Sequence, residues 1–363
     1  MPPSPETAPR TVPETVPDPA PLAGLRVVEL QAIGPVPFAG MCLAGLGARV
    51  VRVLAPRDRP VALELEAEAD VLNRGKCERR IDLKTGAGRE ALHALLADAD
   101  ALLEGFRPGV LERLELAPGA LLARHPRLVV GRLSGFGEAG PLAARAGHDI
   151  NYLALSGALG AIGPAERPAV PLNLVADFGG GAMHLLAGTL AMLVRRGIDG
   201  RGGVATTSLL AGTLGLTPMV HGLLAAGRWH LAREANALDG GMPFYGVYAA
   251  RDGRFVAVGA LERPFFDALL ALLGLERVVD AERRHDPATW PSMRLAFASA
   301  LATRGRDEWA ALAEGVDCCL SPVLDLVEAL DHPQVRDNAL VEPAPFARPG
   351  PPVRFSRPED PSP

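Results

Sequence analysis

Three ionisable residues stand beside glycines and apolar runs in a pattern that could carry chemistry. His148 lies in the string G-H-D-I-N-Y, Asp177 stands just before three glycines in A-D-F-G-G-G, and Glu262 follows the run V-A-V-G-A-L. The glycines lead into an apolar stretch that predicts a helix, which places Asp177 near a helix N-terminus. Exposed N–H groups at such an end favour anions, so a carboxylate is favoured at this position.

Each of the three residues also has a purely structural interpretation. Asp177 could simply cap the helix that follows it. His148 is one of eight histidines, and a lone histidine is usually structural or on the surface. Glu262 could be a solvated turn residue or belong to the first turn of the next helix. The residue types and their spacing leave both interpretations open for all three.

Several common catalytic motifs are missing from the sequence. It contains no G-x-x-x-x-G-K-[ST] loop, no G-x-S-x-G and no H-E-x-x-H, which argues against a P-loop nucleotide site, a serine hydrolase elbow and this class of zinc site. The string D-F-G at 177–179 lacks the other kinase motifs. The first predicted strand is followed by Q-A-I-G-P-V-P, which does not meet G-x-G-x-x-G, so a dinucleotide site is weakly supported.

The elements that must position these residues begin as alternating strands and helices. Short apolar runs predict strands at 25–30, 48–54, 100–104 and 128–133. Helices are expected between them at about 38–46 and 90–97, with another beginning at 111–114. This order is typical of a doubly wound, Rossmann-like parallel sheet. The chain from about 151 to 231 is expected to be mainly helical.

A second, smaller α+β domain is expected near 230–320. Alternation at 244–249 and 255–259, joined by a turn at Asp252-Gly253, predicts a β-hairpin. Helices are expected to follow at about 264–273 and 294–303.

Composition excludes some classes of partner and compartment. The net charge of −5 gives no reason to expect nucleic acid or an anionic membrane as a partner. Four cysteines without a C-x-x-C pair indicate a reduced, cytoplasmic chain without structural zinc or another metal site. The stretches 178–194 and 204–227 are nearly free of charge but broken by Gly, Thr, Ser or Pro, which favours buried helices over membrane spans.

Several segments together resemble one known family. They read L-A-G-L-R-V-V-E-L, R-L-S-G-F-G, A-G-H-D-I-N-Y-L-A-L-S-G, P-L-N-L-V-A-D-F-G-G-G, L-D-G-G-M-P-F-Y and V-A-V-G-A-L-E. In this order, over nearly all of residues 22–325, they are similar to the α-methylacyl-CoA racemases of the family III CoA-transferase superfamily. The histidine of G-H-D is typical of the racemase branch.

The resemblance implies an enzyme that interconverts (R)- and (S)-2-methylacyl-CoA thioesters through an enolate. It implies that His148 and Asp177 are the acid–base pair, each removing the α-proton of one enantiomer, and that burial raises the pKa of Asp177 toward that of the histidine. Glu262 would hold the histidine ring in orientation. Asn173, with helix-terminal N–H groups, would bind the thioester oxygen, and Tyr245 is a further substrate contact.

Coenzyme A carries phosphates, so the resemblance also implies basic contacts. The matching positions are Arg52, Arg74, Lys76, Lys84 and Arg107. Gly147, Asp149 and Tyr152 would line the path of the pantetheine arm. No cofactor beyond the coenzyme A moiety of the substrate is expected. Most such charges could equally be solvated surface residues.

Two other functions are compatible with the same residues. A family III CoA-transferase would use Asp177 as a nucleophile and carry coenzyme A as an aspartyl thioester. A protein that only binds acyl-CoA would show stabilisation by ligand without α-proton exchange.

The sequence departs from the family pattern at two places. Ala55 stands where the family has an arginine for the coenzyme, with Arg57 or Arg59 as possible replacements. The segment 200–206, G-R-G-G-V-A-T, lacks the family's glutamine and aspartate, which could change packing or the dimer.

The expected organisation is an interlocked homodimer. A disordered leader at 1–21, rich in Pro, Glu and Thr, precedes a large CoA-binding domain at 22–205. A helical linker at 206–229, a small domain at 230–320 and, at 321–363, a segment that returns to the large domain and ends in an irregular tail follow. The resemblance implies that each site combines the large domain of one subunit with the small domain of the other.

Overall fold

The computed structural model describes residues 20–57, 65–66, 68–343 and 346–356. The leader expected at 1–21 therefore lies outside the described residues, apart from its last two. The chain forms two compact units. The sheet unit comprises the chain up to Ser156, Pro171–Thr217 and the chain from Pro351, and the small unit comprises Gly157–Val170 and Pro218–Gly350.

The sheet unit is built on six parallel strands in the order β3-β2-β1-β4-β5-β6. The strands are β1 (Arg26–Leu30), β2 (Arg49–Leu54), β3 (Cys77–Arg80), β4 (Ala101–Glu104), β5 (Val129–Ser134) and β6 (Gly203–Ser208). The doubly wound parallel sheet expected from the sequence is confirmed. The strand order reverses between β1 and β4, and ligands of such sheets bind beyond the carboxyl ends of the strands at that point.

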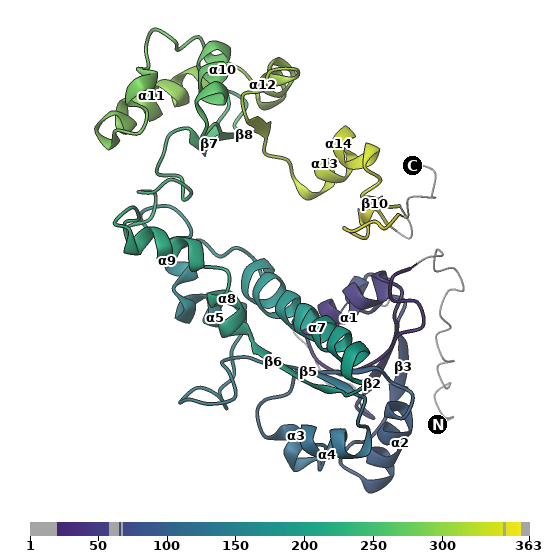
Figure 1. Ribbon diagram of the computed structural model, residues 1–363. Coiled ribbons are helices and arrows are strands. Elements are labelled where there is room, and N and C mark those ends of the chain that lie inside the picture. Colours follow the sequence, from purple (N-terminus) through teal and green to yellow (C-terminus); the bar gives the residue numbers. More distant parts are fainter. Residues whose placement is uncertain (1–19, 58–64, 67, 344–345, 357–363) are drawn as a thin grey trace, which may run out of the picture. The chain divides into compact units, whose positions relative to one another are not determined.

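Helices cover both faces of this sheet (Figure 1). On one face, leucines of α2 (Gly86–Leu96), α3 (Val110–Arg113) and α4 (Pro118–Arg124) form a core with the strands. On the other face lie α1 (Pro35–Gly45) and α7 (Met183–Asp199). Helix α1 begins earlier than expected, because Pro35 and Pro37 stand in its first turn, where a missing N–H breaks no helical bond.

The two edge strands were not predicted. Strand β3 reads C-E-R-R and β6 reads G-V-A-T-T-S, whereas every residue of the central strands β4 and β5 is buried. An edge strand has a neighbour on one side only and carries polar residues, so it lacks the apolar run that marks a buried strand. The expectation that 151–231 is mainly helical is wrong at β6.

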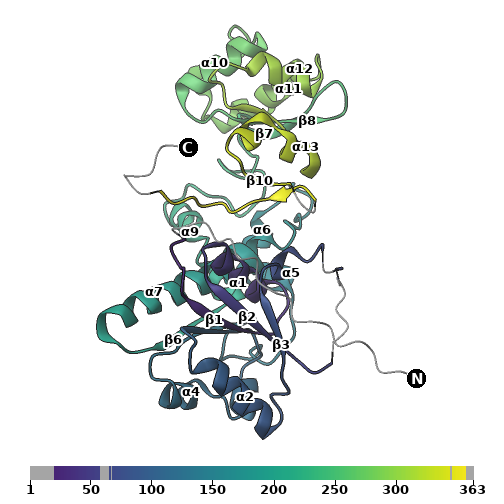
Figure 2. The ribbon, with the colours of Figure 1, turned by 90° about the vertical axis from the view of Figure 1, so that its right-hand side faces the viewer.

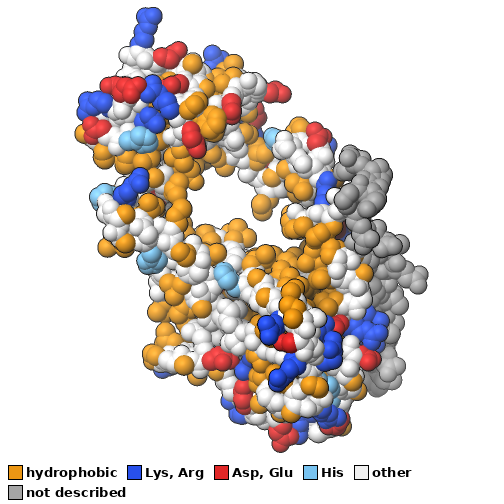
Figure 3. Space-filling view, in the orientation of Figure 1, with side chains coloured by type: hydrophobic (Ala, Val, Ile, Leu, Met, Phe, Trp, Pro, Cys, Tyr) orange, Lys and Arg blue, Asp and Glu red, His pale blue; other side chains and the backbone are white. Residues whose placement is uncertain are grey.

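The remaining elements of the sheet unit carry, or pack near, the polar residues predicted for the site. They are the short turn η1 (Val71–Asn73), α5 (Asp149–Ser156), the π-helical segment η2 (Leu174–Ala182) and α8 (Leu209–Leu214). The segment η2 continues directly into α7. The combined helix Leu174–Asp199 is long and apolar enough to cross a membrane by length and hydropathy, with 33% of its most apolar window buried. Core helices of soluble proteins meet the same criterion. Its exposed apolar residues include Met183, Val194 and Ile198, and Figure 3 shows how widely hydrophobic side chains reach the surface.

The small unit contains an antiparallel sheet of β7 (Tyr245–Ala249), β8 (Phe255–Gly259) and β9 (Leu320–Pro322). The predicted hairpin is confirmed, and Gly253 takes a positive φ of 77° at its turn. Phe244, Phe266 and Phe297 form the centre of its core. The helices α10 (Arg263–Leu273), α11 (Trp290–Leu301) and α12 (Arg306–Ala313) lie on one side of the sheet (Figure 2).

Residues 157–170 belong to the small unit, although they were expected within a large domain at 22–205. Helix α6 (Ala158–Ala161) and the loop after it are held by Arg233, whose guanidinium donates to the carbonyls of Gly160, Pro164 and Ala165. These bonds link segments about seventy residues apart, as the chain crosses to this unit and returns.

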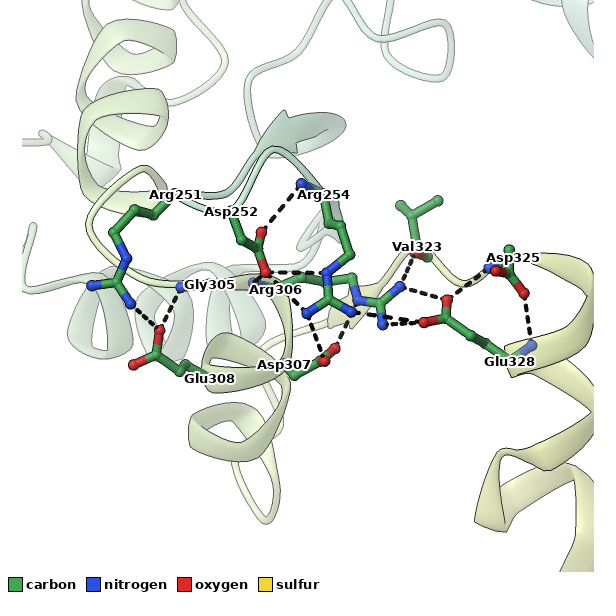
Figure 4. Close-up of polar contacts among 10 residues, drawn as sticks. All are labelled: Arg251, Asp252, Arg254, Gly305, Arg306, Asp307, Glu308, Val323, Asp325 and Glu328. Atoms are coloured by element: carbon green, nitrogen blue, oxygen red, sulfur yellow. Dashed lines mark hydrogen bonds and ion pairs between the residues drawn. The ribbon is translucent and has the colours of Figure 1, made fainter.

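An ion-pair network lies within the small unit and connects α12 to the segment that follows β9 (Figure 4). The buried Arg306 binds both carboxylate oxygens of Glu328 at 2.7 Å and donates to the carbonyl of Val323 at 2.9 Å. Glu328 lies in α13 (Leu326–Asp331), which Asp325 caps. The network therefore holds α13 on α12, and the chain up to Gly350 belongs to the small unit, whereas a return to the large domain was expected from residue 321. The other elements of this unit are α9 (Pro218–Ala225), η3 (Ala281–Arg283), η4 (Pro287–Thr289), α14 (Pro333–Asp337), β10 (Val341–Glu342) and β11 (Arg348–Pro349).

Candidate active site

Asp177 lies in the first turn of the π-helical segment η2. Such wide turns are rare and are frequent at functional sites. The glycines that follow let this segment pack closely on α8. A Cβ atom on Gly180 would lie 2.8 Å from the backbone nitrogen of Thr213, and one on Gly212 would lie 2.1 Å from the carbonyl oxygen of Gly180. The glycine run is therefore explained by backbone contact between two helices.

The structure brings His148 and Asp177 together through the first turn of α5. One carboxylate oxygen of Asp149 accepts the backbone N–H groups of Ala176 at 2.9 Å and of Asp177 at 2.7 Å. The side-chain oxygen of Asn151 accepts the backbone N–H of His148 at 3.0 Å. The G-H-D-I-N string thus holds the backbones of both residues in the proposed pair.

The pKa of Asp177 is raised to about 6. Burial is the largest cause, and the nearby carboxylate of Asp149 raises it further, while a hydrogen bond from the Asn173 side chain and the charge of His148 lower it. This direction agrees with the expectation from the sequence. A carboxyl group with a pKa near neutral can act as an acid in one direction and as a base in the other.

The surroundings of Asp177 come from three elements. A Cβ atom on Gly34, the residue that precedes α1, would lie 3.3 Å from a carboxylate oxygen of Asp177. The ring of Phe178 stacks on Phe38 of α1 with centroids 4.3 Å apart. Asn173, expected to bind a thioester oxygen, instead hydrogen-bonds the Asp177 carboxylate in this structure. These contacts fix one wall of the site.

Tyr152 and Gly147 support the histidine loop. The Tyr152 side chain is 5% exposed and packs edge-on against Phe136. A Cβ atom on Gly147 would lie 3.0 Å from its ring. Burial, followed by the charge of Asp177, raises the pKa of Tyr152 to about 12, and Arg107 lowers it. Tyr152 therefore faces the interior of the loop more than a path open to a ligand.

Arg52 and Lys76 do not lie where a coenzyme phosphate could reach them. Both are buried. The Lys76 ammonium lies 2.7 Å from Glu29 and donates to the carbonyl of Pro37 at 2.8 Å. Arg52 lies between Glu29 at 3.3 Å and Glu78 at 2.8 Å.

The strand register explains this arrangement. Glu29 of β1 is aligned with Arg52 of β2, and Arg52 is aligned with Glu78 of β3. Contact with a phosphate would require either cation to leave the fully buried Glu29 carboxylate.

The other predicted basic contacts reach the surface. Arg74, Lys84 and Arg107 are exposed. Sequence reasoning missed Arg80, at the end of β3, which donates to the carbonyl of Ala55 at 3.0 Å. A guanidinium therefore stands beside the position where the family arginine is replaced by Ala55. Arg57 is exposed, and Arg59 lies outside the described residues.

The last two predicted site residues belong to the small unit. Glu262 is exposed at the residue that precedes α10, and within the described chain its side chain makes no capping bond to that helix. Tyr245 is half-buried at the start of β7. Their roles at the His148–Asp177 pair stay predictions. No group of three or more His, Cys, Asp or Glu side chains among the described residues is arranged to hold a metal ion.

Comparisons with known proteins identify relatives over most of the chain. The family described as CoA-transferase family III matches residues 22–360. The chain is 44% identical to a mouse protein named alpha-methylacyl-CoA racemase over 91% of this chain and 86% of that protein. It is 41% identical to the human protein of the same name over 86% of this chain and 80% of that protein.

A solved structure shares the fold. The crystal structure of a CAIB/BAIF family protein from Brucella suis superposes with a TM-score of 0.76 and 27% identity, covering 93% of each chain. The family match, the named relatives and the solved structure each cover most of the chain. The chain belongs to CoA-transferase family III.

Proposed function

We propose that this protein is an α-methylacyl-CoA racemase, which interconverts the (R) and (S) forms of 2-methylacyl-CoA thioesters. The observation that carries the proposal is the pairing of His148 with a half-buried Asp177 whose pKa is raised to about 6. The identity to proteins named as racemases supports the same conclusion. Racemisation requires only three groups at the site, namely a base, an acid and a hydrogen-bond donor for the enolate oxygen.

The chemistry follows from the weak acidity of a thioester α-proton. A positioned base must remove it, and a hydrogen-bond donor must stabilise the oxygen as the enolate forms. For one enantiomer neutral His148 takes the proton and protonated Asp177 returns one to the opposite face of the carbon. For the other enantiomer the Asp177 carboxylate is the base and the protonated imidazole is the acid. A pKa of about 6 leaves about one tenth of Asp177 protonated at pH 7.

Other parts of the site take supporting roles in this proposal. Helix-terminal N–H groups bind the thioester oxygen, while the Asn173 amide holds the Asp177 carboxylate. Arg74, Lys84, Arg107 and Arg80 are the candidate contacts for the coenzyme phosphates, because they reach the surface. No cofactor besides the coenzyme A moiety is needed. We also propose a cytoplasmic location.

We further propose that the protein is an interlocked homodimer. In this arrangement Glu262 of the partner subunit orients the ring of His148. Light scattering on the purified protein tests the dimer, and a monomer at assay concentrations would count against it.

Chiral analysis of the acyl-CoA tests the proposed reaction. Either enantiomer should approach an equal mixture, and His148→Ala and Asp177→Ala should abolish the interconversion. Full activity in both variants would refute the pair. A panel of acyl groups identifies the preferred substrate.

The family also makes a CoA-transferase a second candidate. In that reaction the Asp177 carboxylate attacks the acyl-CoA carbonyl and expels the coenzyme thiolate. The thiolate then attacks the aspartyl carbonyl, which releases the carboxylic acid and leaves an aspartyl-CoA thioester. Mass spectrometry of the protein after incubation with acyl-CoA, with hydroxylamine trapping, detects that adduct. A racemase should show none.

A further inference from the structure

Asp149 connects the two residues of the proposed proton-transfer pair. It follows His148 directly in the chain, and its side chain holds the backbone of Asp177. Asp149 is buried, with 6% of its surface exposed. Movement of this one residue would therefore shift the base on one face of the substrate relative to the acid on the other.

The Asp149 side chain also caps the N-terminus of η2, although it lies in a distant part of the sequence. Ala176 and Asp177 lie in the first turn of η2, where backbone N–H groups have no partner within the helix. The residue that precedes η2, Asn173, makes no side-chain cap, and its amide bonds the Asp177 carboxylate instead. One oxygen of Asp149, 27 and 28 residues earlier in the chain, satisfies both N–H groups.

The second carboxylate oxygen of Asp149 has no hydrogen-bond partner among the residues that the structure describes. A buried, unpartnered carboxylate oxygen is unfavourable. An asparagine would keep the first oxygen, and with it both backbone bonds. The carboxylate therefore contributes something that an amide would not, which is its negative charge beside Asp177.

We propose that Asp149 is a positioning residue of the proton-transfer pair, which fixes the place of Asp177 relative to His148 and places a buried carboxylate beside the Asp177 carboxyl group. This inference rests on the proposed function. It assigns Asp149 a role distinct from contact with the pantetheine arm, since the side chain is buried and bonded to η2.

Few other charges face Asp177 from the elements packed on η2. His148 and the Asn173 amide lower the Asp177 pKa. The charge of Asp177 in turn raises the pKa of Tyr152 in α5. Helix α1 has one titratable residue, Cys42, and α8 has none. His184 at the start of α7 bonds the carbonyl of Gly180. Asp149 is thus the carboxylate whose charge opposes ionisation of Asp177.

The test replaces Asp149 in two ways. Asp149→Asn keeps the acceptor and removes the charge, whereas Asp149→Ala removes both. Asp325→Asn is a matched control, because one oxygen of Asp325 also accepts two consecutive backbone N–H groups, at 2.8 and 2.7 Å, at the start of α13. The Asp177 carboxyl is titrated by carbon-13 NMR, with its signal assigned from Asp177→Asn, and the pH profile of racemisation is measured in parallel.

We expect Asp149→Asn to lower the pKa of Asp177 and to leave KM nearly unchanged. Each unit of fall lowers the protonated fraction at pH 7 about tenfold, so fewer molecules hold the protonated Asp177 that one direction needs. The rate should then fall in both directions, because the equilibrium between the enantiomers fixes the ratio of the two. Asp149→Ala should lose kcat in both directions, and Asp325→Asn should match the parent protein.

An unchanged Asp177 titration in Asp149→Asn would overturn the inference, as would a profile equal to that of the parent. The titration does not depend on catalysis. If the parent protein exchanges no α-proton of any acyl-CoA, the proposed function fails, while the effect of Asp149 on Asp177 is still measured separately. If Asp149→Ala does not fold, Asp149→Asn alone decides.

Discussion

Replacing Lys76 by methionine separates two roles for this residue, a coenzyme contact or an internal ion pair. Lys76→Met keeps the length of the side chain but leaves the fully buried Glu29 carboxylate without its closest cation, now 2.7 Å away. Breaking a buried pair by removing one partner costs about 3–5 kcal/mol. Because Arg52 stays 3.3 Å from Glu29, we expect the lower end, about 3 kcal/mol.

Urea unfolding measures this loss, and coenzyme A affinity is measured on the same samples. Lys84→Met is the control, because Lys84 is exposed, and it should change the free energy of unfolding by less than about 0.5 kcal/mol. The double variant Glu29→Gln/Lys76→Met should recover much of the stability, since the unpaired charge is gone. If Lys76→Met keeps the parent stability and weakens only coenzyme binding, the internal role is wrong.

Three further predictions follow from the site. Both directions need a pair that carries one proton in total, on Asp177 for one enantiomer and on His148 for the other. Because Asp177 has a pKa of about 6, both directions should lose rate as the pH falls through about 6, where the pair takes up a second proton; rate profiles measured from each pure enantiomer should share this limb, and its absence from either profile would argue against the assignment. Gly212→Ala should destabilise the protein by about 1–3 kcal/mol in thermal or urea unfolding, because its Cβ would lie 2.1 Å from the Gly180 carbonyl oxygen. The control Gly222→Ala has open space around it and should not destabilise the protein. Equal stabilities of the two variants would count against close packing of η2 on α8. Arg107→Gln should weaken coenzyme A binding about tenfold or more, as expected for a lost hydrogen bond to a charged group, with the fold unchanged. Calorimetry measures the affinity, and an unaltered value would show that Arg107 is not part of the site.

Most of the central sheet could be predicted because buried strands need apolar runs. Strands β1, β2, β4 and β5 and the β7–β8 hairpin carry such patterns. The edge strands β3 and β6 do not, because a strand with one open side tolerates charged, Gly and Thr residues. The π-helical geometry around Asp177 has no sequence pattern of its own, and the glycines that allow it resembled the entry to an ordinary helix.

The candidate site was predicted unevenly for physical reasons. His148 and Asp177 stand in specific strings, and the resemblance assigned them to one pair. Arg52 and Lys76 were interpreted as coenzyme contacts because charge alone does not reveal a partner. Their partner, Glu29, is set by the register of parallel strands and by the loop before β3. The link from Asp149 to η2 joins a side chain to a backbone 28 residues away, which no local pattern encodes.

The central claim is that His148 and Asp177 act on opposite faces of one carbon atom. The most direct test incubates each pure enantiomer of a 2-methylacyl-CoA in deuterated water with Asp177→Ala and with His148→Ala. Each variant keeps one base, so we predict slow deuterium uptake from a single enantiomer, a different one for each variant, without inversion. Inversion in either variant, or uptake from the same enantiomer in both, would contradict the account.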